Sequence, residues 1–176
     1  MKFLPTPLGG AHVVELEPQE DERGYFARSF CREEFAQRGL KSEFAQCSVS
    51  LNHRRGTLRG MHYQVKPHQE AKLVRCTRGR IQDVIVDLRA GSPSFKQWLA
   101  VELSADNSRM LYVPEGFAHG FLTLADDTEV FYQISEVHHP ESARGFRWND
   151  PAFGIAWPAP VQVISDRDRD YPNFQP

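Results

Sequence analysis

The feature that most constrains this chain is a long succession of short apolar runs, rich in Val, Ile, Phe and Tyr. Gly, Pro, Asn or Asp separates most of them, and this combination predicts β-strands joined by turns. The strand-like runs are 11–17, 24–30, 44–51, 57–63, 72–77, 81–88, 97–103, 110–113, 118–124 and 129–135. Because no helices alternate with them, the pattern predicts an all-β sandwich or barrel and excludes a parallel α/β sheet.

The segments outside these runs are few. Residues 32–40 predict a helix, since Glu34 and Arg38 are four residues apart and Gly39 is a natural stop. Residues 18–24 predict a polar turn, and the charged tail from 165 onward is expected to lie on the surface. No low-complexity linker interrupts the chain, so residues 1–176 are expected to form one domain.

Composition excludes several classes of protein. The formal net charge is only −2, so no basic field predicts a nucleic-acid partner. No segment approaches the roughly 20 apolar residues of a membrane span, and the first ten residues lack the apolar run of a signal peptide. Three cysteines without a CxxC spacing favour a reducing, cytoplasmic setting and argue against a disulfide scaffold or a zinc ribbon.

The stretch GTLRGMHYQ, residues 56–64, carries two polar side chains that a strand does not need. Arg59 and His62 are three residues apart, so on a regular strand they point to opposite faces. A bulge at Gly60 would bring both to one side. Taken alone, the pair is better explained by a surface arginine and a core histidine bonded to a carbonyl.

Four other positions raise the same question. His119 follows a Pro/Gly turn, Lys72 opens an apolar strand, Tyr132 lies within another, and Asp168 lies in the charged run 165–171. Each has an ordinary structural explanation: a satisfied histidine, an edge lysine, a core phenol bonded to backbone, a solvated carboxylate. Together they supply a base, a phenol, a cation and an acid on one β-scaffold.

Several of these stretches occur in an order typical of one family. They are RGYF (23–26), GTLRGMHYQ, KLVRC (72–76), DVIVDLR (83–89), VPEGFAHGF (113–121), Tyr132 and RWNDP (147–151). The chain resembles the dTDP-4-dehydrorhamnose 3,5-epimerase family from about Arg23 to Asp168. The resemblance implies a cupin-type double-stranded β-helix jelly roll with a few short helices. It also implies a homodimer that needs no cofactor or metal and acts on a nucleotide-linked 4-keto-6-deoxy sugar.

The resemblance also assigns roles to the polar residues. His62 matches the base, Tyr132 the acid on the opposite face of the sugar, and Asp168 the carboxylate that pairs with the histidine. Lys72 would stabilise the enolate oxygen that forms at C4. The matching substrate-binding positions are Arg23 and Arg59 for the diphosphate, His119 for the sugar, and Arg28, Gln46, Ser48 and Arg167 for the nucleotide or sugar.

The chain departs from the family pattern where nucleotide or sugar is recognised. Arg28 replaces a glutamate, Cys47-Ser48 replaces Asp-Asn, and Arg167 replaces a lysine. Ala143 replaces a glutamate and His138 a tyrosine. We therefore expect the proton-transfer chemistry to be kept, while the nucleotide, the sugar or the number of inverted carbons differs.

Three other functions compete with this interpretation. A metal-dependent cupin oxygenase would use His62 and His119 with Glu70 or His68, although Gln64 occupies the position of a usual second histidine. A 3,4-ketoisomerase would not need both Tyr132 and the His62–Asp168 pair. A sugar-nucleotide-binding protein would gain nothing from an opposed base and acid.

Overall fold

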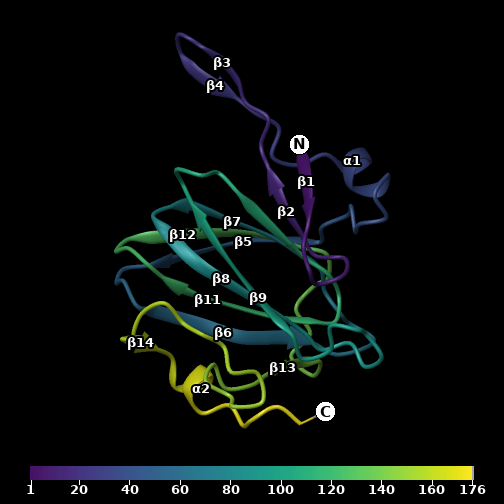
Figure 1. The fold of residues 1–176 in the computed structure, drawn as a ribbon, viewed down its shortest axis with the longest axis vertical. Coiled ribbons are helices and arrows are strands. Elements are labelled where there is room, and N and C mark those ends of the chain that lie inside the picture. Colours follow the sequence, from purple (N-terminus) through teal and green to yellow (C-terminus); the bar gives the residue numbers. More distant parts are fainter. Residues whose placement is uncertain (176) are drawn as a thin grey trace.

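Two antiparallel β-sheets face each other in the computed structural model, which describes residues 1–175 (Figure 1). The strand order in the first sheet is β1 (Lys2–Pro5), β2 (His12–Glu15), β10 (Met110–Val113), β7 (Lys72–Arg78), β12 (Thr128–Ile134) and β5 (Gln46–Asn52). The order in the second is β13 (Ala143–Gly145), β6 (Thr57–Gln64), β11 (Phe117–Thr123), β8 (Arg80–Asp87) and β9 (Trp98–Ser104). A short strand, β14 (Val163–Ile164), pairs with β6 in parallel. The predicted all-β, jelly-roll architecture is confirmed.

The core lies between the two sheets and follows the two-residue alternation of each strand. On β8, Ile81 and Ile85 point into it, and on β7, Val74 and Cys76 do so from the facing sheet. The side chains of Lys72 on β7, His119 on β11 and Asp83 on β8 are buried as well. The interior is therefore apolar along part of each strand and polar toward one end.

The outer faces of the sheets are covered by the chain's non-strand segments. Phe35 of helix α1 (Arg32–Ala36) packs on Leu73 and Tyr112 outside the first sheet. Phe146 and Phe153 pack on Val84 and neighbouring residues outside the second sheet. Burial on both faces explains why β7, β8 and β11 contain continuous apolar stretches.

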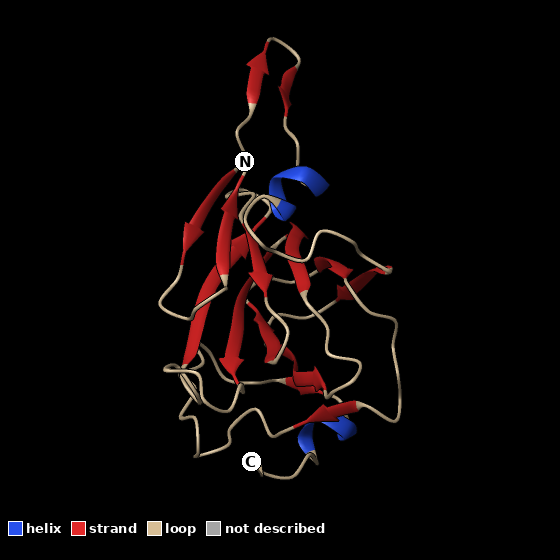
Figure 2. Cartoon of the chain, turned by 90° about the vertical axis from the view of Figure 1, so that its right-hand side faces the viewer, coloured by secondary structure: helices blue, strands red, loops and turns tan. Residues whose placement is uncertain are grey.

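The segment 18–24, expected to be a polar turn, instead forms most of a β-hairpin. Strands β3 (Gln19–Asp21) and β4 (Gly24–Phe26) form a hairpin that projects from the body of the molecule at the end opposite the C-terminal helix (Figures 1 and 2). The expected strand 24–30 is thus shorter, and its exposed side chains include Tyr25 and Phe26. We refer to residues 19–26 as the arm.

The predicted helix at 32–40 is confirmed but shorter, and it ends in a turn in which Gly39 has φ +69°. Arg38 does not pair with the Glu34 carboxylate, because its guanidinium donates to the main-chain oxygen of Glu34 instead. The charged tail also differs from expectation. Residues Asp166–Arg169 form helix α2, capped by the Ser165 side chain, and Asp168 is buried against β6.

Within residues 1–175, the helices are all too short to cross a membrane.

Candidate active site

A β-bulge places Arg59 and His62 in the same cavity. Strand β6 pairs His62 with His119 and Arg59 with Phe121, so the register shifts between the two pairs. Gly60 has φ +143°, and a Cβ there would lie 2.6 Å from the Cα of Gly120 on the neighbouring strand. Both side chains line a cavity of about 390 Å³ between the sheets. The bulge that Gly60 permits is present, so the simpler explanation, an unrelated surface arginine and core histidine, is wrong.

His62 forms a dyad with Asp168. The Nε2 atom of His62 lies 2.7 Å from Oδ1 of Asp168, and the main-chain N–H of Gly60 donates to Oδ2 at 3.2 Å. Burial by itself would raise the pKa of Asp168, but the His62 contact, the Gly60 bond and the Arg167 charge hold it below its ordinary value. The carboxylate is therefore ionised and accepts the proton of Nε2, which leaves Nδ1 as the basic nitrogen of the ring.

Tyr132 lines the same cavity from the other sheet. It lies on β12, whereas His62 lies on β6, so the phenol and the imidazole come from facing walls. Its hydroxyl is bonded to the hydroxyl of Ser50, 3.2 Å away, and not to backbone as expected for a core tyrosine. Burial raises the pKa of Tyr132 far above its ordinary value, an effect that the Ser50 bond only partly offsets. The phenol therefore stays protonated at neutral pH.

Lys72 brings a buried cation to the cavity. Its Nζ lies 2.8 Å from the Glu70 carboxylate, and the lysine is only 9% exposed. The second oxygen of Glu70 accepts a hydrogen bond from Gln64. The partner expected for a buried lysine is therefore present, and it fixes the position of the ammonium group.

His119 is held by a carboxylate that sequence reasoning missed. Its Nε2 lies 2.7 Å from Oδ1 of Asp83, and both side chains are buried. The ring of His119 packs edge-on against Tyr132, with centroids 6.2 Å apart. Asp83 lies between Ile81 and Ile85 on the inward face of β8. An acidic residue at an inward position of an apolar strand is the sequence signal that could have predicted a buried carboxylate here.

Arg59 is positioned by Asn52, which was not among the expected site residues. Its Nε donates to Oδ1 of Asn52 at 2.8 Å, and the amide of Asn52 is anchored in turn to the Thr128 carbonyl. Ser48 and Arg167 line the cavity as expected. The two hydrogen bonds of Asn52 therefore hold the Arg59 side chain in place, although Arg59 itself is exposed.

Three expected substrate-binding residues are not among those that line this cavity. Arg23 lies on the arm, 84% exposed, and pairs with Asp21. Arg28 pairs with Glu34 beside helix α1. Gln46 begins β5, where its side chain accepts the main-chain N–H of His138 at 3.0 Å.

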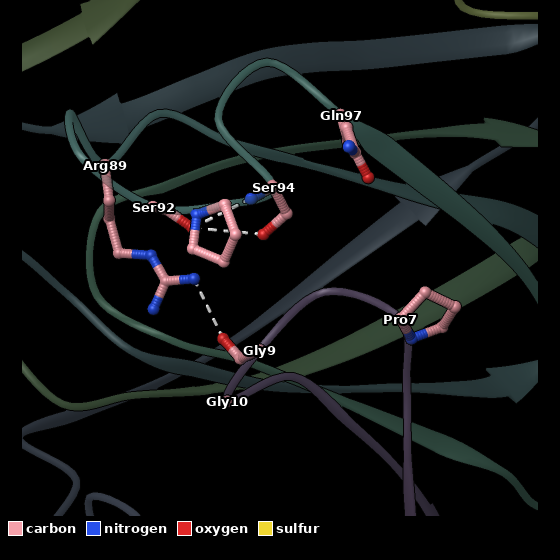
Figure 3. Close-up of a pocket in the computed structure, with 8 residues that line it drawn as sticks. Pro7, Gly9, Gly10, Arg89, Ser92, Ser94 and Gln97 are labelled. Atoms are coloured by element: carbon pink, nitrogen blue, oxygen red, sulfur yellow. Dashed lines mark hydrogen bonds between the residues drawn. The ribbon is translucent and has the colours of Figure 1, made fainter.

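A second cavity, of about 650 Å³, lies between the loop 7–10 and the β8–β9 connection (Figure 3). Arg89 donates to the Gly9 carbonyl at 2.9 Å, and Ser92 and Ser94 are bonded to each other (Figure 3). Asp87 accepts hydrogen bonds from all three of these side chains, which hold its pKa well below its usual range although burial would raise it. These polar side chains are all hydrogen-bonded to one another or to the Gly9 carbonyl. They hold the N-terminal loop in place, and none of them is left free for catalysis.

The ligand set of a metal-dependent oxygenase does not assemble in the cavity. His62 and His119 line the cavity but His68 does not, and Glu70 is engaged by Lys72 and Gln64. In the described part of the chain, the His and acidic side chains with the spacing of a metal site are His68, Glu136 and His139, outside this cavity.

Comparisons with known proteins agree with this geometry. The family model for dTDP-4-dehydrorhamnose 3,5-epimerase matches residues 5–176. The enzyme of that name from Methanothermobacter thermautotrophicus is 44% identical, over 97% of this chain and 92% of its own. The one from Bacillus anthracis, solved with TDP and pyrophosphate bound, gives a TM-score of 0.94 at 41% identity, covering 98% of this chain and 99% of that one.

A third relative has a narrower activity. The 3'-monoepimerase from Streptomyces bikiniensis, solved with dTDP-quinovose, gives a TM-score of 0.88 at 37% identity, covering 96% of this chain and 86% of that one. Full-length matches of this quality are not produced by a shared fold alone. The chain belongs to the dTDP-4-dehydrorhamnose 3,5-epimerase family and is an isomerase.

Proposed function

We propose that this protein inverts C3 and C5 of a thymidine-diphosphate-linked 4-keto-6-deoxyhexose, with His62 as base and Tyr132 as acid. One observation carries the assignment of roles: an aspartate-paired imidazole and a protonated phenol face one cavity from opposite sheets. Inversion needs a proton removed from one face of the carbon and another delivered to the opposite face. A solved relative from Legionella pneumophila contains dTDP-4-keto-L-rhamnose, which is the product of such a reaction.

His62 removes the proton. The 4-keto group acidifies the hydrogens at C3 and C5, so a neutral imidazole is a sufficient base at neutral pH. Asp168 accepts the hydrogen bond from Nε2, which fixes the tautomer and stabilises the imidazolium as it forms. Removal of the proton leaves an enolate whose negative charge lies on the C4 oxygen.

Lys72 stabilises this enolate oxygen. A preorganised charge aimed at an atom where charge develops is worth about 10²–10³ in rate when a single donor is removed. Glu70 holds the ammonium group in place before the reaction begins, so no reorganisation is needed in the transition state. The same pair compensates the cost of burying the lysine in the substrate-free protein.

Tyr132 delivers a proton to the opposite face of the planar enolate. Because the pKa of its phenol is raised, Tyr132 keeps its proton at neutral pH. It gives up this proton only to a strong base, and the enolate carbon is such a base. The hydrogen bond to the Ser50 hydroxyl keeps the phenol oriented.

Arg59 binds the diphosphate, and His119 and Arg167 contact the rest of the substrate. A guanidinium suits this role because its planar fork donates to two phosphate oxygens together. Asn52 fixes the fork, so binding energy from the non-reacting nucleotide positions the sugar ring between His62 and Tyr132.

We further propose that the protein works as a homodimer of single-domain chains in the cytoplasm. The arm carries Arg23 and exposes Tyr25 and Phe26, which are 55% and 75% exposed. The edge strand β5 also exposes Val49 and Leu51. A second copy would cover these apolar groups, and its arm would bring Arg23 to the first copy's cavity. Three free thiols agree with a reducing compartment.

The test is deuterium incorporation. The enzyme is incubated with dTDP-4-keto-6-deoxyglucose in D₂O, and the sugar is analysed by mass spectrometry and NMR. Label at both C3 and C5, absent in His62→Ala, is the expected result. The Tyr132→Phe variant separates the two half-reactions, because it retains the base but lacks the acid.

Other outcomes correct the proposal in defined ways. Label at one carbon makes the protein a mono-epimerase, like the Streptomyces bikiniensis relative. If no label appears, the assay is repeated with CDP-, GDP- and UDP-linked keto sugars. Strong deuterium uptake with one of them would show that the enzyme recognises a different nucleotide. Binding of these compounds without exchange in any of them refutes the catalytic proposal in favour of a binding protein.

A further inference from the structure

The geometry points to a transition-metal site, suited to Zn²⁺, formed by His68, Glu136 and His139 outside the catalytic cavity. His68 lies in the β6–β7 connection, and Glu136 and His139 lie in the connection that follows β12. Each residue offers one ligand atom, and these atoms all lie within 4.8 Å of one another. All three side chains are partly buried, so they are less mobile than surface groups yet reachable from solvent.

The two imidazoles are already side by side. Their ring centroids are 3.5 Å apart, with an angle of 13° between the planes. Neutral imidazole is the form of histidine that binds metal. Tetrahedral Zn²⁺ with bonds of about 2.0–2.1 Å needs ligand atoms about 3.3 Å apart. Because the lone pair of each nitrogen lies in its own ring plane, one ring must rotate out of the stack before both can bind one ion, and the partly exposed side chains have room to do so.

The hydrogen bonding of His139 favours a cation at its other nitrogen. Nδ1 of His139 lies 3.1 Å from the Glu141 carboxylate and donates its proton there. Nε2, the other ring nitrogen, lies 3.8 Å from the carboxylate of Glu136. A nitrogen and a carboxylate thus face each other at a separation close to the one that two ligands of a single metal ion have. A histidine whose second nitrogen is held by a carboxylate is also the usual arrangement around protein-bound metals.

One buried side chain holds the two connections together. Gln64, only 4% exposed, donates to the carbonyls of His68 and Val137, both at 3.1 Å. Its carbonyl accepts the main-chain N–H of His139 at 2.7 Å. The backbone at both histidines is therefore fixed before any metal binds, which lowers the ordering cost of binding.

This cluster is distinct from the catalytic groups. None of His68, Glu136 and His139 is among the residues that line the cavity. Gln64 and Glu70 lie between the cluster and Lys72, linked by hydrogen bonds. Two histidines and one carboxylate leave a fourth position for water, the ligand set of an open Zn²⁺ site.

The experiment measures metal binding directly. The full chain is dialysed against EDTA, and Zn²⁺ is titrated by calorimetry, with Co²⁺ absorption as the reporter of coordination geometry. We expect a single Zn²⁺ per chain and tetrahedral Co²⁺ bands. His139→Ala and Glu136→Gln should weaken Zn²⁺ binding at least about tenfold, and Glu141→Gln should weaken it about tenfold through the second nitrogen of His139.

His53→Ala is the matched control, since His53 is another histidine beside an aspartate, 3.4 Å from Asp127 on an exposed loop. Zn²⁺ should bind this variant as tightly as the wild type, and should raise the melting temperature of both but not of His139→Ala. Absence of Zn²⁺ uptake by the wild type overturns the proposal. So does uptake that survives in His139→Ala and Glu136→Gln, or that is lost in His62→Ala, which would place the metal in the catalytic cavity.

Discussion

Replacing Asp168 by asparagine tests the dyad with the smallest change of shape. The carboxylate accepts two hydrogen bonds, from Nε2 of His62 at 2.7 Å and from the Gly60 N–H at 3.2 Å. Asparagine keeps one acceptor oxygen and turns an NH₂ group toward the other donor. Loss of one charge-assisted bond at a buried site costs about 1.5–3 kcal/mol of unfolding free energy at pH 7. The base also loses its fixed tautomer, so kcat should fall by about 10²–10⁴.

The loss of stability should depend on pH with a definite sign. The pKa of folded Asp168 lies below its ordinary value of 3.8, so near that pH the unfolded chain binds more protons than the folded one. The stabilisation from the carboxylate is therefore complete above 3.8 and is lost as the pH falls through the folded pKa. The difference in stability between wild type and Asp168→Asn should be largest at neutral pH and should shrink in acid.

The assay combines urea unfolding between acidic and neutral pH with steady-state rates at neutral pH. Asp166→Asn is the matched control, because Asp166 lies on the same helix but is 86% exposed and pairs with Arg169. It should change neither quantity appreciably. A kcat within about threefold of wild type in Asp168→Asn would refute the role of the dyad in proton transfer.

Three further substitutions test other parts of the site. Tyr132→Phe should retain hydrogen exchange into solvent but lower the rate of inversion by at least about 10², as measured by comparing deuterium uptake with the amount of epimer formed. Equal losses of exchange and inversion would contradict a separate base and acid. Gly60→Ala should destabilise the fold by about 2–4 kcal/mol in urea unfolding, because its φ is +143° and the added Cβ lies 2.6 Å from the Cα of Gly120; a loss below 0.5 kcal/mol would mean that the bulge relaxes easily. Arg59→Lys should raise KM for the nucleotide sugar about tenfold or more with a smaller effect on kcat, since the fork held by Asn52 is lost; an unchanged KM would remove Arg59 from diphosphate binding.

Most strands of the sandwich were predictable because their signals are local, whereas the short strands β1, β13 and β14 were not predicted. Alternation and turn residues at 72–77, 81–88 and 110–113 place each strand to within a residue or two of β7, β8 and β10. The arm was missed because residues 19–21 are all charged or polar and pack on no core. Helix α2 was missed because four residues cannot show a helical period.

The site could be predicted only in part, since its partnerships join residues far apart in the chain. His62 and Asp168 are separated by 106 positions, and no local pattern pairs them. The resemblance to a known family supplied this pair and Tyr132. It did not supply Asp83 behind His119, Asn52 behind Arg59, or Glu70 behind Lys72. These partners are chosen by sheet register, which is a property of the assembled fold.

The proposed catalytic residues and the proposed substrate-binding residues lie in different parts of the fold. His62, Lys72, His119 and Tyr132 lie on strands whose other side chains form the core, so moving them disturbs packing worth several kcal/mol. The expected nucleotide contacts at 23, 28 and 167 lie on the arm, beside α1 and on α2, where the side chains are exposed. Substitutions at such positions change stability by only about 0.5 kcal/mol. Substitutions at 28 and 167, where the chain departs from the family pattern, therefore cost the fold little, so substrate recognition has room to vary there without disturbing the proposed catalytic residues.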